Sequence, residues 1–184
     1  MESINLTQDD KDSLAELFNI AFNTAANQAG TLIQMPTRIT MPEVSQVKPG
    51  RIEELFEQKA LNISYQCTGA YRGTWMFVLE AGAVVKLGSL LVNKQLSMAS
   101  DAGMAEAVTA VKDFIDNLAL VTTDTLVSTT GHEFRGDAGR CSLQNKEEYV
   151  FPRDFDPGIV EIRLPLKAGT EFEAIMFCFL PLPF

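Results

Sequence analysis

The sequence is poor in the residues that form metal centres, disulfide frameworks and catalytic relays. It has one histidine, His132, and three widely separated cysteines, Cys67, Cys141 and Cys178, without a CxxC pair. An odd number of isolated cysteines argues against a disulfide framework and against a zinc site. We therefore expect reduced cysteines in the core, a histidine in a surface loop and no metal-binding site.

Basic residues and phosphate-binding loops are also scarce. The chain has 15 Lys and Arg residues against 24 Asp and Glu residues, so its formal net charge is -9. Proteins bind nucleic acids largely through Lys and Arg that displace counterions from phosphates, and the sequence contains neither a Walker loop nor a dinucleotide fingerprint. The composition therefore disfavours a nucleic-acid partner and leaves a protein surface or a small ligand open.

Long hydrophobic runs are absent as well. No stretch reaches the roughly 18 uncharged apolar residues that suggest a membrane-spanning helix. The most apolar segment, AIMFCFLPLPF at 174–184, is interrupted by Pro181 and Pro183, and predicts a buried strand and its exit. The first ten residues, MESINLTQDD, contain neither a basic leader nor an apolar run. These features predict a cytoplasmic protein without a membrane partner.

The residues that are present predict one domain over 1–184. The chain is 46% hydrophobic and 21% charged, and 184 residues suffice for one substantial core. Its first helix is expected to start at Thr7, with Asp10 as the partner in a capping box, and to end before Pro36. After it we expect, in order, a strand at 37–47, a turn at Pro49 and Gly50, a short helix at 51–58, a hairpin at 61–80 around the turn TGAYRG, and a short helix at 81–92.

The second half repeats this plan. A long helix is predicted from about Ser100 to Thr130, followed by an irregular, charged segment at 131–158 with one or two edge strands. A second hairpin is predicted at 158–180. At a shift of 98 to 99 residues the apolar positions of the two hairpins align: Leu61, Ile63, Tyr65 and Cys67 fall on Val160, Ile162, Leu164 and Leu166. We therefore predict an α+β fold of two duplicated helix-plus-hairpin units, at about 1–98 and 99–184, which share an antiparallel sheet covered by long helices.

One face of the first helix carries a stripe of acids and amides. Asp12, Glu16, Asn19, Asn23 and Asn27 fall within a narrow arc of the helical wheel, opposite a stripe of Leu, Phe and Ala. We expect the polar stripe to face outward. Most acids and amides on such a face are merely solvated, so the stripe alone does not predict a functional site.

The spacing within the stripe is far more specific. Three residues lie between Asp12 and Glu16, two between Glu16 and Asn19, and 22 between Asn19 and Pro42. This pattern resembles, position for position, the signature of the CheC, CheX and FliY phosphatases of chemotaxis. The segments ELFNIAFNTAA, MPEV and GTWMFVLEAGAVVKLGSLLV are similar to the catalytic helix, the next strand and the strand-to-helix segment of that family. The resemblance covers about residues 8–95 well and the second half more weakly, and it implies a CheC-like fold.

The same resemblance implies an aspartyl-phosphate protein phosphatase that acts on the receiver domain of a CheY-like response regulator. In the roles that it implies, Asn19 holds the attacking water without acting as a base, and Glu16 pairs with a Lys of the receiver. Asp12 assists at the rim, and Pro42 sets the path of the strand because its ring fixes φ. No cofactor of this chain is implied, and Mg²⁺ is expected in the receiver domain.

The second half departs from the signature. At a shift of 98 residues Asn117 aligns with Asn19, whereas Phe114, Ala110 and Arg140 take the places of the other three signature residues. The amide therefore persists without its acid. We expect one working site, and we interpret Asn117 as a remnant of a degenerate second site that is used for packing more than for activity.

A non-catalytic alternative stays open. An adaptor that binds a receiver or a CheD-like deamidase, or a component of the flagellar-switch type, would use the same face with little turnover. Asn19 separates the two hypotheses, because it is dispensable for docking and required for hydrolysis. A homodimer, and a two-component circuit other than chemotaxis, also stay open.

Overall fold

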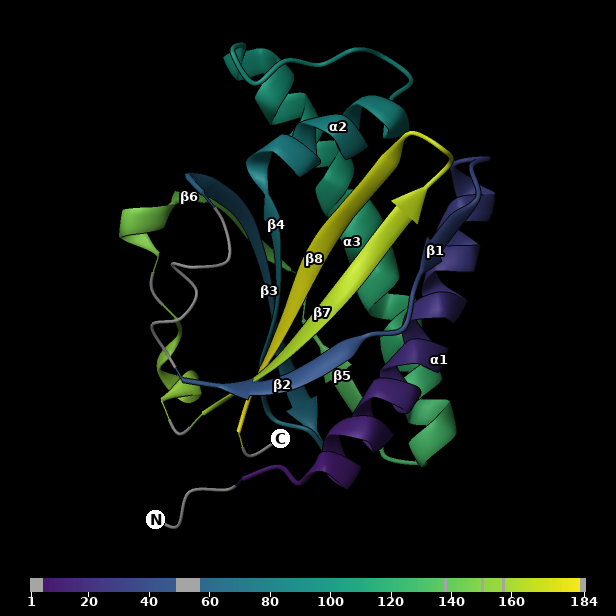
Figure 1. Ribbon diagram of the computed structural model, residues 1–184, viewed down its shortest axis with the longest axis vertical. Helices are drawn as coiled ribbons and strands as arrows, with labels where there is room; N and C mark the ends of the chain where they lie inside the picture. The colour runs from purple at the N-terminus through teal and green to yellow at the C-terminus, as the bar shows by residue number, and fades with distance from the viewer. Residues whose placement is uncertain (1–4, 49–56, 138, 150, 157, 183–184) are drawn as a thin grey trace.

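The computed structural model describes residues 5–48, 57–137, 139–149, 151–156 and 158–182, and it has helices packed on an antiparallel sheet (Figure 1). Its main elements are α1 (Gln8–Leu32), β1 (Thr37–Ile39), β2 (Glu43–Val47), β3 (Lys59–Gly69), β4 (Gly73–Glu80), α2 (Ala81–Leu91), α3 (Asp101–Thr130), β5 (Phe134–Gly136), β6 (Arg140–Asn145), β7 (Ile159–Ala168) and β8 (Phe172–Pro181). The predicted α+β class with an antiparallel sheet is confirmed.

The sheet has the same arrangement when it is followed inward from either edge. The strand order is β1-β7-β8-β4-β3-β5, with β2 also paired to β7 and β6 also paired to β3. Each half therefore contributes a long hairpin to the centre and a pair of short strands to the hairpin of the other half. The two hairpins meet where β4 pairs with β8, as at Phe77 and Cys178. Because the halves exchange their short strands, they form one continuous sheet. The duplication itself stays a prediction.

Both long helices cover the same face of this sheet. In Figure 1, α3 lies behind the strands, α1 runs beside the edge that carries β1 and β2, and α2 lies across one end. The two sets of hairpin residues that align in the sequence all belong to the core on this side: Leu61, Ile63, Tyr65 and Cys67 from β3, and Val160, Ile162, Leu164 and Leu166 from β7. The two-residue alternation of both strands thus supplies one apolar surface for the helices.

The helix ends follow the predicted punctuation. Thr7 and Asp10 form the capping box of α1, in which the Thr7 side chain accepts from the Asp10 N–H and the Asp10 carboxylate accepts from the Thr7 N–H. These hydrogen bonds lower the pKa of Asp10. Ser100 caps the start of α3, and Gly131 ends it with a φ of 71°, a left-handed conformation that glycine adopts without strain.

The segment at 37–47 differs from the prediction, because it forms two strands in place of one. β1 ends at Ile39 and β2 begins at Glu43, with Pro42 in the connection between them. Pro42 has no N–H to donate to a strand ladder, which explains why the pairing with β7 is interrupted there. The turn predicted at Pro49 and Gly50 and most of the helix predicted at 51–58 lie outside the described residues.

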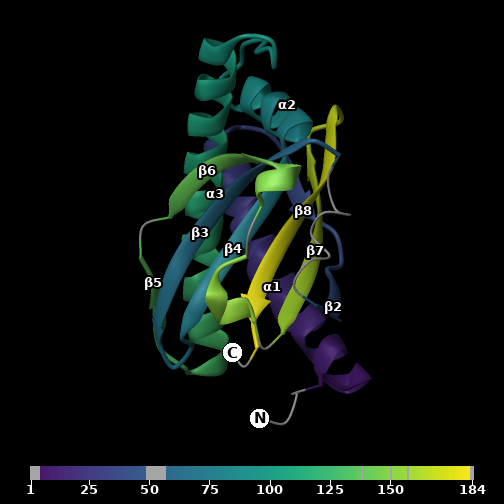
Figure 2. The same ribbon diagram turned by 90° about the vertical axis from the view of Figure 1, so that its left-hand side faces the viewer.

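The opposite face of the sheet is covered by the irregular segment that follows β6. This segment contains two short 3-10 helices, η2 (Lys146–Glu148) and η3 (Arg153–Phe155), and it lies in front of the strands in Figure 2. Its aromatic rings pack on residues of β4 and β8. The Phe151 ring packs edge-on against Phe179, with 5.4 Å between the centroids. The one or two edge strands predicted in this region are β5 and β6.

The three cysteines are free thiols, as predicted. Cys67 and Cys178 are buried, and Cys141 is half-buried. Burial raises the pKa of Cys67 to about 12 and also raises the pKa of Cys178, which accepts a hydrogen bond from Trp75 Nε1 at 2.6 Å. These thiols therefore stay protonated at neutral pH and pack as small apolar side chains.

The contact between α2 and α3 makes a specific stability prediction. A Cβ atom added at Gly88 would lie 2.7 Å from the Ala107 Cα, whereas one at Gly82 on the same helix would meet nothing within 4 Å. Gly88→Ala should lower the free energy of unfolding by about 1–3 kcal/mol, the usual cost of overpacking. Gly82→Ala should be neutral or stabilising by up to about 1 kcal/mol through helix propensity. Urea unfolding measures both, and equal midpoints would contradict the close packing.

Candidate functional site

The polar stripe of α1 is anchored to the edge of the sheet by Asn23. Strand β1 lies at that edge, and the buried Ile39 turns its N–H toward the helix, where it donates to Asn23 Oδ1 at 3.3 Å. Without a side-chain acceptor on α1, this edge N–H would be buried and unpaired, which is costly. Asn23 therefore fixes the position of α1 beside β1.

The same side chain orients Asn19, one turn earlier. Asn23 Nδ2 donates to Asn19 Oδ1 at 2.7 Å and to the Asn19 backbone carbonyl at 3.0 Å. An amide oxygen has two lone pairs and an amide nitrogen has two hydrogens. Asn19 therefore keeps one lone pair and its Nδ2 donors for a further partner, since within the described residues no hydrogen bond uses them. The arrangement holds a carboxamide in a fixed direction.

The acids of the stripe lie farther out. Glu16 is exposed on the turn before Asn19, and Asp12 is exposed one turn earlier, where its Oδ1 accepts from Gln8 Nε2 at 2.8 Å. Asn27 is also exposed. The expectation of a stripe that faces outward is therefore confirmed for these three positions. It is wrong for Asn19 and Asn23, which are half-buried because β1 lies against that side of the helix.

Pro42 is the fourth residue of the signature, and it lies buried between β1 and β2. Both strands contact α1, so the connection that holds Pro42 is at the same edge of the sheet that Asn19 and Asn23 face. Two apolar side chains next to signature residues are exposed, Ile20 at 54% and Met41 at 55%. The site is thus an open surface in which a fixed amide and an exposed acid stand beside apolar groups.

Comparison with known proteins points to one group. No family model matches the chain. In sequence, the flagellar motor switch phosphatase FliY of Bacillus subtilis is 24% identical over 88 residues, which cover 48% of this chain and 23% of FliY. In structure, FliY of Thermotoga maritima superposes with a TM-score of 0.84 at 18% identity, over 97% of this chain and 93% of that one. This chain is therefore similar in sequence to a FliY protein, and it shares its fold with FliY, CheX and CheC-like proteins.

FliM proteins also share this fold. FliM from a Helicobacter pylori FliG–FliM complex superposes with a TM-score of 0.67 at 10% identity, over 96% of this chain and 95% of that one. A CheX and a CheC-like protein share the fold with TM-scores of 0.58 and 0.56. The CheC-like fold expected from the signature is therefore confirmed.

Asn117 occupies a different environment from Asn19. It lies on α3 beside a cavity of about 300 Å³ that is also lined by Ala29 of α1, by Ile33 directly after α1 and by Leu91 of α2. Its buried Oδ1 has no hydrogen-bond partner among the described residues. Asn117 thus faces the other helices, whereas Asn19 adjoins an edge strand. Its interpretation as a remnant stays a prediction.

Asp116 is the residue of α3 that faces the edge strands of the second half. Its Oδ1 accepts from the Tyr65 hydroxyl at 2.6 Å and lies 3.0 Å from the position of an added Cβ at Gly139, next to β6. Lys112 pairs with the other carboxylate oxygen, which raises the pKa of the lysine. Asp116 directly precedes Asn117, so their side chains point about 100° apart around the helix. Asn117, the residue that aligns with Asn19 at a shift of 98, therefore does not lie on the face of α3 that adjoins the edge strands. Asp116 lies on that face.

The described residues show no cluster of three or more His, Cys, Asp or Glu side chains that could hold a metal ion. Among the helices of the described chain, none is both long and apolar enough to cross a membrane. His132 is exposed just after the end of α3, as expected for a loop histidine.

The anchoring role of Asn23 can be tested by stability. Asn23→Ala should lower the free energy of unfolding by about 1–3 kcal/mol, because the buried Ile39 N–H loses its acceptor. Asn27→Ala removes an exposed amide from the same stripe and should be neutral or slightly stabilising. Chemical denaturation compares the two, and an Asn23→Ala protein as stable as Asn27→Ala would show that α1 is not held by this bond.

Proposed function

We propose that this protein is an aspartyl-phosphate phosphatase that acts on the receiver domain of a CheY-like response regulator. The observation that carries the proposal is the acid and amide pair of Glu16 and Asn19 on successive turns of α1, with the amide of Asn19 oriented by Asn23. The relative from Bacillus subtilis, named a motor switch phosphatase, supports the same class of activity.

The chemistry requires little from this chain. In a phospho-aspartate the leaving group is a carboxylate, which is a weak base, so the attacking water needs alignment more than deprotonation. The water oxygen bonds to phosphorus while the bond from phosphorus to the aspartyl oxygen breaks, and the products are inorganic phosphate and a free carboxylate. Asn19, through its remaining lone pair and its Nδ2 donors, would hold the water in line. Mg²⁺ of the receiver would neutralise the phosphoryl oxygens.

Glu16 is suited to docking. Its exposed carboxylate lies one turn from Asn19, so an ammonium group on the receiver would reach it while the phosphoryl group lies against the amide. Asp12 is one turn farther away and would contribute at the rim. Pro42 would act through the backbone, because it interrupts the edge strand and has no donor to offer.

The alternative function is a docking protein of the switch type. FliM proteins share the fold, and two of the similar FliM structures are complexes, one with FliG and one with SpeE. A chain with this fold could therefore bind a receiver, a CheD-like deamidase or a switch protein through α1 without turnover. This hypothesis and the phosphatase hypothesis require different behaviour of Asn19.

The decisive experiment follows the decay of a CheY-type receiver that has been phosphorylated with a small phosphodonor. The wild-type protein should accelerate the decay, and Asn19→Ala should lose most of that acceleration, roughly 10²-fold, the cost expected when an attacking group is misplaced. Binding to a beryllofluoride-activated receiver should stay nearly unchanged. Binding by the wild type without any acceleration would instead support the docking protein.

Glu16→Ala should weaken both binding and acceleration, and the loss should shrink as salt rises, because an exposed charge pair is screened. Asn27→Ala and Asn117→Ala are the matched controls, since each removes an Asn from a helix outside the acid and amide pair. Both should leave the decay rate within about twofold of wild type. A strong loss in Asn117→Ala would show that the second half retains a working site.

A further inference from the structure

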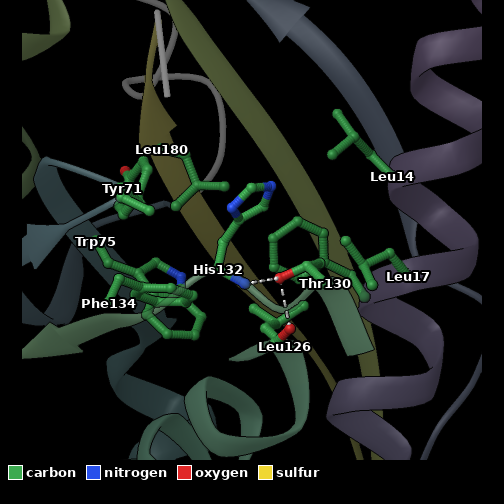
Figure 3. A pocket seen from close by; sticks show the side chains of 11 residues that line it. Leu14, Leu17, Tyr71, Trp75, Leu126, Thr130, His132, Phe134 and Leu180 are labelled. Carbon is green, nitrogen blue, oxygen red and sulfur yellow. Dashed lines mark hydrogen bonds between the residues drawn. The ribbon is translucent and has the colours of Figure 1, made fainter. Parts of the chain in front are cut away.

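A cleft of about 380 Å³ lies between the start of α1, the end of α3 and the turn that joins β3 to β4. Leu14 and Leu17 project into it from α1, with Leu126 from α3 and Leu180 from β8 on other sides (Figure 3). Leu14 and Leu17 are only half-buried. Apolar side chains that wall a partly open space leave surface that a ligand can cover.

The chemistry of this cleft contrasts with that of the whole chain. The chain carries a net charge of -9, yet the residues that line the cleft include no Asp, Glu, Lys or Arg. Its inner wall is aromatic, with the buried ring of Trp75 beside Phe134 and Tyr71, whose rings meet edge-on at 5.9 Å. Trp75 is only 2% exposed, so Phe134 and Tyr71, which are half-buried, offer the aromatic surface on which a flat, apolar molecule can stack.

The polar groups of the cleft are few. The Thr130 hydroxyl donates to the Leu126 carbonyl at 2.8 Å and accepts from the His132 backbone N–H at 3.3 Å, so it is engaged within the chain. The exposed His132 ring stands among the apolar side chains in Figure 3. An imidazole can donate to an anionic or neutral acceptor in either of its charge states.

We propose that this cleft binds a small apolar molecule of two or three rings that carries one acidic or hydrogen-bond-accepting group. The rings would lie against Phe134 and Tyr71, and the acceptor would meet the His132 ring. The volume falls within the range of pockets that hold small organic ligands, roughly 300–1,000 Å³. The proposal stands on its own and does not depend on the phosphatase activity.

The chain contains its own reporter for this site, because Trp75 is its one tryptophan and lies in the wall of the cleft. The probe is anilinonaphthalene sulfonate, which has separate aromatic rings and a single anionic group. Titration of the full chain should give saturable energy transfer from Trp75 to the probe, with one probe bound per chain.

Two variants test whether the signal comes from the cleft. Ala70 lines the cleft, so Ala70→Phe should weaken probe binding about tenfold or more by filling the space. Ala99→Phe places the same ring on an exposed residue of the connection between α2 and α3, and should leave binding unchanged. His132→Ala should weaken binding several-fold and leave energy transfer at saturation intact, and circular dichroism verifies that each variant is folded.

Three results would overturn the proposal. These are the absence of energy transfer at any probe concentration, equal affinity of Ala70→Phe and Ala99→Phe for the probe, and binding only after removal of Pro183 and Phe184. The last result would show that the end of the chain itself occupies the cleft.

Discussion

A single carboxamide, that of Asn23, connects the sheet to the helix that carries the candidate site. It accepts from the edge N–H of Ile39 and donates to Asn19, so one side chain both pairs the edge N–H and orients the amide of the candidate site. An edge strand must satisfy or protect its outward N–H groups. Here that requirement sets the position of α1 and with it the direction of Asn19. The amide of Asn19 is therefore held in place by the fold, whereas the carboxylate of Glu16 is exposed and can meet a partner.

The two edges of the sheet meet their helices in different ways. In the first half an amide pair adjoins β1 and leaves hydrogen-bonding capacity unused at Asn19. In the second half Asp116 adjoins the region of β5 and β6, and both of its oxygens are taken, by Tyr65 and by Lys112. The first arrangement can accept a water molecule and a partner, and the second is closed by internal contacts. This contrast explains why the fold has one candidate site and not two, although the sheet is arranged alike from both edges.

Much of this structure follows from local sequence rules. The capping box of Thr7 and Asp10, the alternation in both hairpins and the four-residue spacing around Glu16 and Asn19 are short-range patterns, and each identifies its element. The features that were missed depend on the neighbours of a residue in space. To predict the break at Pro42 one must know which strand pairs with this segment. To predict the role of Asn23 one must know that the N–H of Ile39 lies nearby. Asn117 was aligned by counting residues, but a difference of one residue turns a helical side chain by about 100°. The cleft beside Trp75 is lined by residues from five helices and strands, and these residues form no pattern along the chain.

The measurement that tests this account most directly is the receiver dephosphorylation rate at saturating protein for Asn23→Ala beside Asn27→Ala. If Asn23 aims the amide of Asn19, its loss should lower the saturating rate and leave the half-saturating concentration of the folded protein almost unchanged. Asn27→Ala should match wild type in both quantities. A wild-type saturating rate in folded Asn23→Ala would contradict the claim that the edge of the sheet, through this carboxamide, sets the active direction of Asn19.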